Sequence, residues 1–226
     1  MKTLIKKVVP ARLLDVYRKV RDVHVANKEQ RRQIADWKNN GCPVPPPPLI
    51  KQEIIKKYAK KYRMRVFVET GTYMGNTIEA CKDTFDRIIS IELNRNLHER
   101  AKEKFLANNH ITLYQGDSSD VLPAILAGIP EPALFWLDGH YSKGITSRGK
   151  LSTPIMAELQ HVFSHTIDRH VILIDDAHCF TGDDDYPTID TLMQFVIEKK
   201  PLYGFFVQHD IIFIAKKIKR LGFRLL

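Results

Sequence analysis

From residue 65 onward, two hydrophobic patterns alternate along the chain. Short apolar runs are each followed by a segment in which apolar residues recur every three or four positions. The short runs have the length of buried strands, and the periodic segments have the spacing of one helix face. The apolar runs occupy residues 65–69, 87–93, 111–115, 133–138 and 170–176. This alternation predicts an α/β fold with a doubly wound, mostly parallel sheet that is covered on both faces.

The helices are expected in the segments that separate these runs. A helical stretch follows a glycine turn after the first run, and longer helices are expected at 95–107, 119–127, 154–163 and 188–198. The end of the chain breaks the alternation, because two further apolar runs are separated only by His209 and Asp210. So short a connection joins only antiparallel neighbours. We therefore expect a seven-stranded sheet that ends in an antiparallel hairpin over 202–215.

The first part of the chain has a different organisation. Residues 13–23 have the spacing of an amphipathic helix, and the proline-rich segment 39–48 cannot continue a helix or a central strand. A second amphipathic helix is expected at 50–62. We predict two parts, a basic helical arm with its linker at 1–48 and a Rossmann-like domain at 49–226.

Charge is spread unevenly over these parts. The chain carries a net charge of +9, but residues 1–65 carry +13, residues 66–215 carry −9 and residues 216–226 carry +5. A nucleic-acid-binding domain should carry its positive charge on the folded body, so nucleic acid is an unfavoured partner. The basic arm could contact an anionic membrane, an anionic substrate or a second copy of the chain, and packing within its own domain or a homodimer is the simpler interpretation.

Cysteine usage and hydropathy indicate the compartment. The chain has three cysteines and no CxxC pair, so neither a disulfide framework nor a cysteine-rich zinc site is indicated. No apolar run approaches the ~20 residues that cross a bilayer, and Lys6, Lys7 and Pro10 interrupt any signal-peptide core. We expect a cytoplasmic protein, with peripheral membrane contact as the alternative for the arm.

A glycine turn follows the first predicted strand. The sequence from Glu69 to Gly75 is ETGTYMG, which lacks the GxGxxG spacing of dinucleotide-binding proteins. Glycines at this position let a ligand approach the backbone closely. A carboxylate at the strand end disfavours a pyrophosphate and favours a cation or a hydroxyl- and amine-bearing ligand. The alternative is an ordinary strand-to-helix turn with a charged edge.

The next two strands also end near acidic residues. Glu92 lies about 20 residues past the glycine turn, where a carboxylate can accept hydrogen bonds from a ribose. Asp117 and Ser118 follow the third strand, and they could meet an adenine ring or simply cap the next helix. Because such strand ends line the ligand crevice of an open α/β sheet, three acids in succession point to a binding site.

These residues resemble the class I S-adenosylmethionine-dependent methyltransferases. ETGTYMG is similar to their glycine motif, Glu92 to their ribose-binding acid, and Asp117 with Ser118 to their adenine-side motif. The resemblance covers roughly residues 50–217 and implies S-adenosyl-L-methionine as the cofactor. It implies the following cofactor-binding residues: Glu69, Gly71, Thr72, Tyr73, Gly75, Glu92, Asp117 and Ser118. Many members carry a third glycine where this chain has Tyr73.

Two neighbouring strands are followed by further polar groups. Asp138 and His140 follow the fourth strand, and Asp175, Asp176 and His178 follow the fifth. Carboxylate oxygens suit Mg²⁺ or Ca²⁺, and an imidazole suits a general base at neutral pH. Helix capping, loop hydrogen bonds and histidine packing are the structural alternatives. We name Asp138 and His140 as catalytic candidates and His178 as a weaker one.

The same segment resembles the macrocin and cephalosporin-hydroxylase type of methyltransferase relatives. That resemblance implies a divalent cation, Mg²⁺ first, held by Asp138, Asp175 and Asp176. The loop 142–151 carries three basic residues and is either a lid over an anionic substrate or a solvated loop. The acidic run 183–185 is expected to be solvated.

The function predicted from these features is S-adenosylmethionine-dependent O-methylation of a sugar or another small-molecule hydroxyl. An RNA methyltransferase is the nearest alternative enzyme, although no NPPY-like amine-methylating motif follows the fourth strand. A non-catalytic binding or scaffold protein that keeps the fold is the alternative from another class. An NAD-dependent oxidoreductase is disfavoured by the missing GxGxxG and by the final hairpin.

Overall fold

The chain divides into two compact units, Met1–Ile50 and Lys51–Leu226. The computed structural model describes residues 28–139 and 152–217. In the first unit, residues 28–39 are helical, and the Trp37 indole donates a hydrogen bond to the Pro43 carbonyl at 2.8 Å. The expected helix at 13–23 lies outside the described residues.

Helix α2, Pro48–Tyr62, crosses from the first unit into the second. It begins two residues before the expected start at Ile50, and Pro48 is its first residue instead of the last residue of a linker. Proline fits this place because its fixed φ suits the first helical turn, where its missing N–H is not needed.

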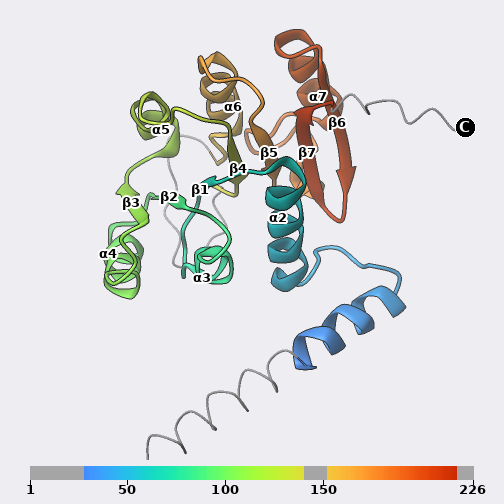
Figure 1. Ribbon diagram of the computed structural model, residues 1–226. Coiled ribbons are helices and arrows are strands. Elements are labelled where there is room, and N and C mark those ends of the chain that lie inside the picture. Colours follow the sequence, from blue (N-terminus) through green and yellow to red (C-terminus); the bar gives the residue numbers. More distant parts are fainter. Residues whose placement is uncertain (1–27, 140–151, 218–226) are drawn as a thin grey trace, which may run out of the picture. The chain divides into compact units, whose positions relative to one another are not determined.

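The second unit alternates strands and helices along most of its length (Figure 1). In chain order its further elements are β1 (Val66–Thr70), α3 (Asn76–Cys81), β2 (Arg87–Glu92), α4 (Arg95–Lys104), β3 (Ile111–Gln115), α5 (Ser118–Ala127), β4 (Ala133–Leu137), α6 (Ile155–Ser164), β5 (Val171–Ile174), the 3₁₀ turn η1 (Ala177–Cys179), α7 (Ile189–Lys199), β6 (Tyr203–Gln208) and β7 (Ile211–Lys216).

The strands form one seven-stranded sheet in the order β3-β2-β1-β4-β5-β7-β6. The first five of these strands are parallel neighbours, and β7 runs antiparallel to both β5 and β6. This arrangement confirms the predicted doubly wound sheet and its final antiparallel hairpin. The chain order reverses between β1 and β4, and such a switch point is where open α/β sheets bind ligands.

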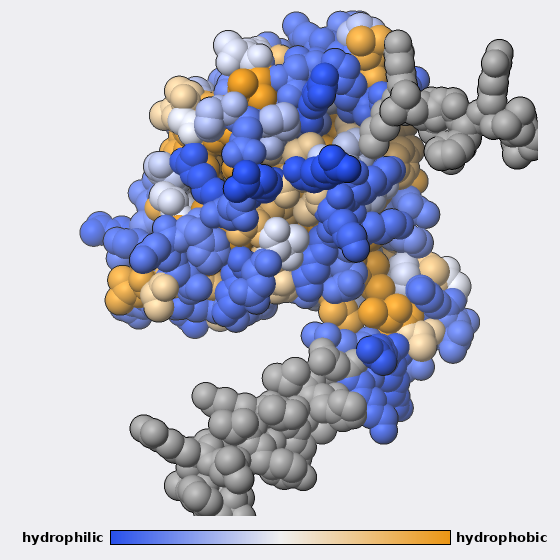
Figure 2. Space-filling model, viewed as in Figure 1, coloured by the Kyte–Doolittle hydropathy of each residue, from blue (hydrophilic) through white to orange (hydrophobic). Residues whose placement is uncertain are grey.

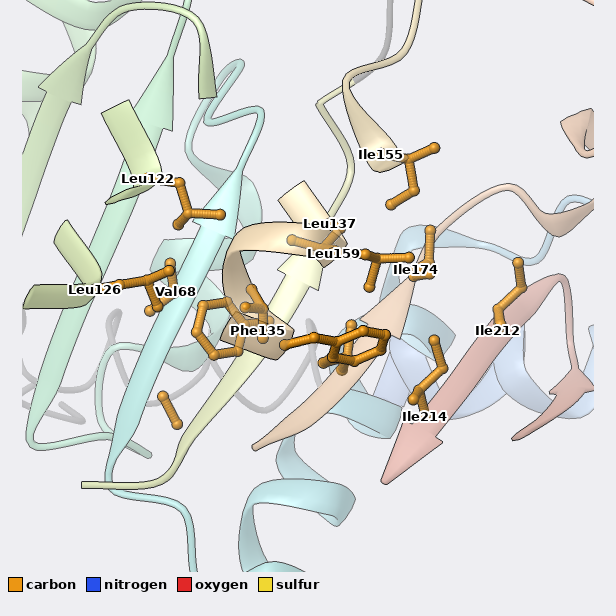
Figure 3. Close-up of a cluster of buried hydrophobic side chains, with 14 of the residues drawn as sticks. Val68, Leu122, Leu126, Phe135, Leu137, Ile155, Leu159, Ile174, Ile212 and Ile214 are labelled. Atoms are coloured by element: carbon orange, nitrogen blue, oxygen red, sulfur yellow. The ribbon is translucent and has the colours of Figure 1, made fainter. Parts of the chain in front are cut away.

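Alternate residues of the strands pack into two separate cores. In β1, Val66 and Val68 belong to a cluster with residues of α5, α6 and α7, whereas Phe67 belongs to a cluster with residues of α2, α3 and α4. Figure 3 shows part of the first cluster, where Phe135 of β4 packs among aliphatic side chains. Burial of each such side chain contributes about 1.5–3 kcal/mol. The two cores hold the sheet rigidly and therefore fix where its strands end.

Strand β5 is shorter than its apolar run predicted. It contains four residues instead of the expected 170–176. His170 lies before the strand and accepts a hydrogen bond from the Ala133 N–H through Nδ1 at 3.0 Å. Asp176 has a φ of 50° and turns the chain out of the sheet. The two carboxylates after β5 are thus part of a turn and not of the strand.

The surface of the described residues is mostly hydrophilic on the face shown in Figure 2. The exposed large apolar side chains are scattered along the described chain and include Leu106, Tyr114, Ile197 and Phe206. Within residues 28–139 and 152–217, none of the helices has the length and apolar character needed to cross a bilayer.

Candidate active site

Five parallel strands end next to one another and bring their following residues to one edge. The strands β1, β2, β3, β4 and β5 end at Thr70, Glu92, Gln115, Leu137 and Ile174. We call this side of the sheet the carboxyl edge. It collects every predicted site residue that the structure describes, with the groups after β4 and β5 beside the glycine turn after β1.

The glycine turn passes close to the backbone that follows β4. The N–H groups of Gly71 and Thr72 both donate to the Ile91 carbonyl, at 2.9 and 3.2 Å. Gly71 has a φ of 88°, and a Cβ there would lie 2.5 Å from the Asp138 carbonyl oxygen. Only glycine fits this position, because a side chain would collide with rigid backbone.

Tyr73 and Gly75 complete the turn. Tyr73 adopts a positive φ of 48° and leaves its side chain 47% exposed. Gly75 has a φ of 68°, and a Cβ there would lie 2.7 Å from the Phe105 ring. The chain therefore keeps a left-handed backbone at Tyr73 without a glycine and leaves the residue exposed.

Glu69 lies beneath the turn and is buried. The Ser90 hydroxyl donates a hydrogen bond to Glu69 Oε2 at 2.6 Å, and Thr72 Oγ1 lies 2.6 Å from Ser90 Oγ. Burial raises the pKa of Glu69 to about 8, although the Ser90 hydrogen bond opposes this shift. With a side chain only 1% exposed, Glu69 shapes the turn from below.

Glu92 connects the end of β2 to this turn. Its Oε2 accepts a hydrogen bond from the Tyr73 N–H at 2.8 Å, and its Oε1 accepts one from the Asn94 N–H at 2.8 Å. A carboxylate has about four acceptor sites, so both oxygens retain capacity for ligand hydroxyls. The predicted ribose contact is compatible with this geometry.

Asp117 is the N-cap of helix α5. Its Oδ1 accepts hydrogen bonds from the Ser119 N–H at 3.0 Å and from the Ser119 hydroxyl at 2.6 Å. This is the capping role that the sequence offered as the alternative. Ser118 is buried, and its hydroxyl opposes the rise of the Glu158 pKa. Contact of Asp117 or Ser118 with the adenine ring of the expected cofactor stays a prediction.

The acids after β4 and β5 form one cluster. Carboxylate oxygens of Asp138, Asp175 and Asp176 all lie within 4.8 Å of one another. Lys51 of α2 points into this cluster, with Nζ 2.6 Å from Asp175 Oδ2 and 3.1 Å from Asp176 Oδ1. Burial raises the pKa of Asp175, as do Asp138 and Asp176, while Lys51 opposes the shift. Lys51 has no sequence signal that points to this cluster, because it lies 124 positions from Asp175.

His178 is held by a buried carboxylate from the hairpin turn. Its Nδ1–H donates to Asp210 Oδ2 at 2.7 Å, and its backbone N–H donates to Asp210 Oδ1 at 2.8 Å. The Asp210 side chain is 2% exposed and that of His178 is 50% exposed. In the neutral imidazole, a proton on Nδ1 makes Nε2 the acceptor nitrogen. Ligand atoms of these two residues and Asp176 lie within 4.8 Å of one another, which places the pair beside the acidic cluster.

Helix α6 contributes a buried carboxyl group that the sequence did not reveal. Glu158 is 1% exposed, its Oε1 has no hydrogen-bond partner, and burial raises its pKa to about 7. It lines a pocket together with Asp138, Gly139, Phe180 and Tyr186. On the sequence, Glu158 looked like an ordinary polar residue of a helix.

Some predicted elements lie outside the described residues or away from this pocket. His140 and the loop 142–151 lie outside them. In the acidic run, Asp183 accepts a hydrogen bond from the Thr181 hydroxyl, and Asp185 accepts one from the Ser152 N–H at 2.8 Å. These two aspartates therefore order the surrounding loop in addition to being solvated.

The fold is similar to that of solved methyltransferase structures. The O-methyltransferase TomG from Streptomyces achromogenes, in complex with S-adenosylmethionine, matches with a TM-score of 0.56 at 14% identity, over 83% of this chain and 88% of that chain. An O-methyltransferase from Bacillus cereus, in complex with S-adenosylhomocysteine, matches with a TM-score of 0.56 at 13% identity, over 83% and 90%. A methyltransferase from Podospora anserina, bound to S-adenosylhomocysteine, matches with a TM-score of 0.55 at 14% identity, over 82% and 88%.

No protein-family model and no curated protein matches the sequence. At these identities the structural likeness shows the fold, which is the class I methyltransferase fold that the sequence predicted. The chemistry of this chain must be argued from its own residues.

Proposed function

We propose that the protein is an S-adenosylmethionine-dependent methyltransferase that methylates a hydroxyl group of a sugar or another small molecule. The observation that supports this most strongly is the His178–Asp210 pair, which lies beside the acidic cluster on the same edge as the glycine turn and Glu92. A cofactor turn and an oriented base are the two parts that methyl transfer to oxygen requires.

The glycine turn fits the expected cofactor. Gly71 lets the turn pack directly against the Asp138 backbone, and Glu92 accepts a hydrogen bond from the turn with spare acceptor capacity. The similar structures of TomG and of the Bacillus cereus enzyme contain S-adenosylmethionine or S-adenosylhomocysteine. S-adenosylmethionine, when bound, supplies a methyl group on a sulfonium sulfur. Its positive charge is favoured by the acids of the carboxyl edge.

His178 is the base that the geometry supports. The acceptor hydroxyl loses its proton to His178 Nε2 while its oxygen forms a bond to the methyl carbon and the carbon–sulfur bond breaks. Asp210 holds the tautomer and stabilises the imidazolium that forms. Cys179 Sγ lies 3.5 Å from the same nitrogen. Burial raises the pKa of this thiol, so it is a weak neutral partner that a substrate hydroxyl can displace.

The chemistry of the acidic cluster suits a divalent cation, but its arrangement does not fit one beside Lys51. The three carboxylates Asp138, Asp175 and Asp176 are hard oxygen ligands. The Lys51 ammonium, however, bonds to two of them. The predicted Mg²⁺ site therefore stays a prediction, and the proposed proton transfer is not routed through it.

The acceptor class follows from the same edge. The carboxylates around His178 repel phosphate groups, which disfavours nucleic acid. They also accept hydrogen bonds, which favours a neutral polyhydroxyl acceptor such as a sugar. As a general base, His178 would take up the proton that a hydroxyl acceptor has to lose.

Two measurements test this function. Calorimetry with S-adenosylhomocysteine should give saturable binding, and transfer of a labelled methyl group to a panel of sugars and phenols should give base-stable methyl ethers. Total RNA is the matched negative acceptor. Absence of S-adenosylhomocysteine binding would remove the methyltransferase assignment, and labelling of RNA alone would replace the acceptor class.

A further inference from the structure

The positive charge in the acidic cluster comes from a side chain of the protein, Lys51. Lys51 lies in the first turns of α2, and its side chain is 18% exposed. Its ammonium contacts Asp175, whose side chain is 3% exposed, and Asp176, whose side chain is 19% exposed. Because these side chains are mostly buried, solvent screens this ion pair less than it screens a surface ion pair.

Lys51 and a divalent ion would compete for the same carboxylate groups, Asp175 and Asp176. Asp175 Oδ2 accepts from Lys51 at 2.6 Å, while Asp175 Oδ1 already accepts from the Asp176 N–H at 2.8 Å. Both oxygens of the most buried carboxylate of the cluster thus accept hydrogen bonds. A metal bound to either oxygen would also bring two positive charges next to the ammonium, in an enclosed place where such repulsion is strong.

The same contact orders the segment that carries His178. Asp176 is the N-cap of η1 and has a left-handed backbone, with φ 50° and ψ 54°. The turn η1 begins at the next residue and contains His178. By bonding to the Asp176 side chain, Lys51 fixes the start of the turn from which the imidazole projects.

We propose that the Lys51 ammonium occupies this acidic cluster permanently. It takes the place of the divalent ion that a cluster of three carboxylates would otherwise suit. Lys51 is a positioning residue: it neutralises Asp175 and Asp176 and holds the turn of His178. Its importance for methyl transfer rests on the proposed function, but its exclusion of metal does not. The consequence is a chain in which metal and Lys51 are mutually exclusive at Asp138, Asp175 and Asp176.

Titration with Mn²⁺, followed by electron paramagnetic resonance of the free ion and by thermal unfolding, tests this exclusion. The wild-type chain should show no saturable site and no thermal stabilisation by Mn²⁺. Lys51→Met should bind Mn²⁺ more tightly by on the order of tenfold or more, and adding Asp175→Asn to that variant should abolish the gain. Lys51→Arg should behave as the wild type, because it keeps the positive charge.

Lys56→Met is the matched control on the same helix, since Lys56 pairs with Glu53 at 3.1 Å and should leave Mn²⁺ binding unchanged. The inference would be overturned if the wild-type chain bound Mn²⁺ saturably and the Asp138→Asn substitution removed that binding. This outcome needs no Lys51 variant. The inference would also be overturned if a folded Lys51→Met gained no site. Because none of these readouts uses the cofactor, they remain decisive if S-adenosylhomocysteine fails to bind.

Discussion

The Glu92 carboxylate accepts a hydrogen bond from the backbone N–H of Tyr73 at 2.8 Å, so the end of β2 holds the glycine turn that follows β1. Glu92 also accepts from Asn94 N–H, which lies at the start of α4. A single buried side chain therefore joins two elements of the predicted cofactor site. Its removal should affect binding and turn geometry together.

Glu92→Ala should weaken S-adenosylhomocysteine binding by roughly 10- to 100-fold, because each lost bond to a charged acceptor contributes about 1.5–3 kcal/mol. Calorimetry measures the affinity directly. Glu103→Ala, an exposed position on α4, is the control and should bind as the wild type does. Equal affinity of Glu92→Ala and the wild type would place Glu92 outside the site.

Gly71→Ala should destabilise the fold by about 1–3 kcal/mol beyond ordinary backbone strain, because its Cβ would overlap the Asp138 carbonyl. Gly182→Ala is the matched variant: Gly182 has a φ of +98°, and a Cβ there would meet a Thr188 methyl carbon at 3.1 Å and no backbone. Urea unfolding of both variants separates strain from collision. Similar losses in the two variants would contradict the close approach between the turn and β4.

Asp210→Asn should lower the methyl-transfer rate by roughly 10²- to 10⁴-fold, the range that an oriented base contributes. The amide no longer favours the Nδ1–H tautomer, so Nε2 ceases to be a reliable acceptor. Affinity for S-adenosylhomocysteine should stay unchanged, which distinguishes a catalytic effect from a folding defect. His110→Gln, whose Nε2 contacts the Lys82 carbonyl, is expected to retain full activity, and a rate unaffected by Asp210→Asn would exclude His178 as the base.

Stability should fall in acid because of His170. Burial lowers the pKa of His170 from 6.5 to about 4, so the unfolded chain takes up the proton first as the pH decreases. The stabilisation is complete above pH 6.5 and is lost as the pH falls towards 4, by about 3 kcal/mol in all. His170→Asn keeps an acceptor for the Ala133 N–H and should remove this contribution. The prediction would be contradicted if the urea midpoints of the wild type and of His170→Asn changed identically between pH 7 and pH 4.

Glu158 should act in the opposite direction. Burial raises its pKa from 4.5 to about 7, so the unfolded chain loses the proton first as the pH increases. Stability should therefore decrease from pH 4.5 to pH 7 and then level, with a loss of about 3 kcal/mol. Glu158→Gln should be more stable than the wild type at pH 8 and equal to it near pH 4. Glu103→Gln is the exposed control, and a Glu158→Gln protein that is less stable than the wild type at pH 8 would contradict the raised pKa of Glu158.

The sheet was predictable from the sequence because its evidence is local. Val66, Phe67 and Val68 form a continuous apolar run since successive side chains enter two different cores, and such runs identify a strand covered on both faces. The hairpin was predictable because only His209 and Asp210 separate its strands. The ends of β5 were not predictable from hydropathy. His170 lies outside the strand because it accepts a hydrogen bond, and Asp176 lies outside it because it forms a turn.

The candidate site was only partly predictable, because its side chains have partners that are distant in sequence. His178 ranked below His140 when neither had a visible partner, and the structure shows that Asp210, 32 positions later, orients His178. Lys51 belongs to a helix that precedes the sheet and had no signal beyond its amphipathic spacing. The acids at the strand ends were recognisable because chain order and sheet topology together place them on one edge.

The reversed direction of β7 has a consequence for how this molecule can change. Because β7 starts where β5 ends, the turn before it lies at the carboxyl edge, and His209 and Asp210 both adopt positive φ there (Figure 1). A change in the length of this turn would leave the paired strands and both cores intact while removing the carboxylate from His178. The hairpin tip is therefore a position where the proposed catalytic role of His178 and the fold can be separated: a chain with an altered tip should keep its fold and lose the proposed methyl transfer.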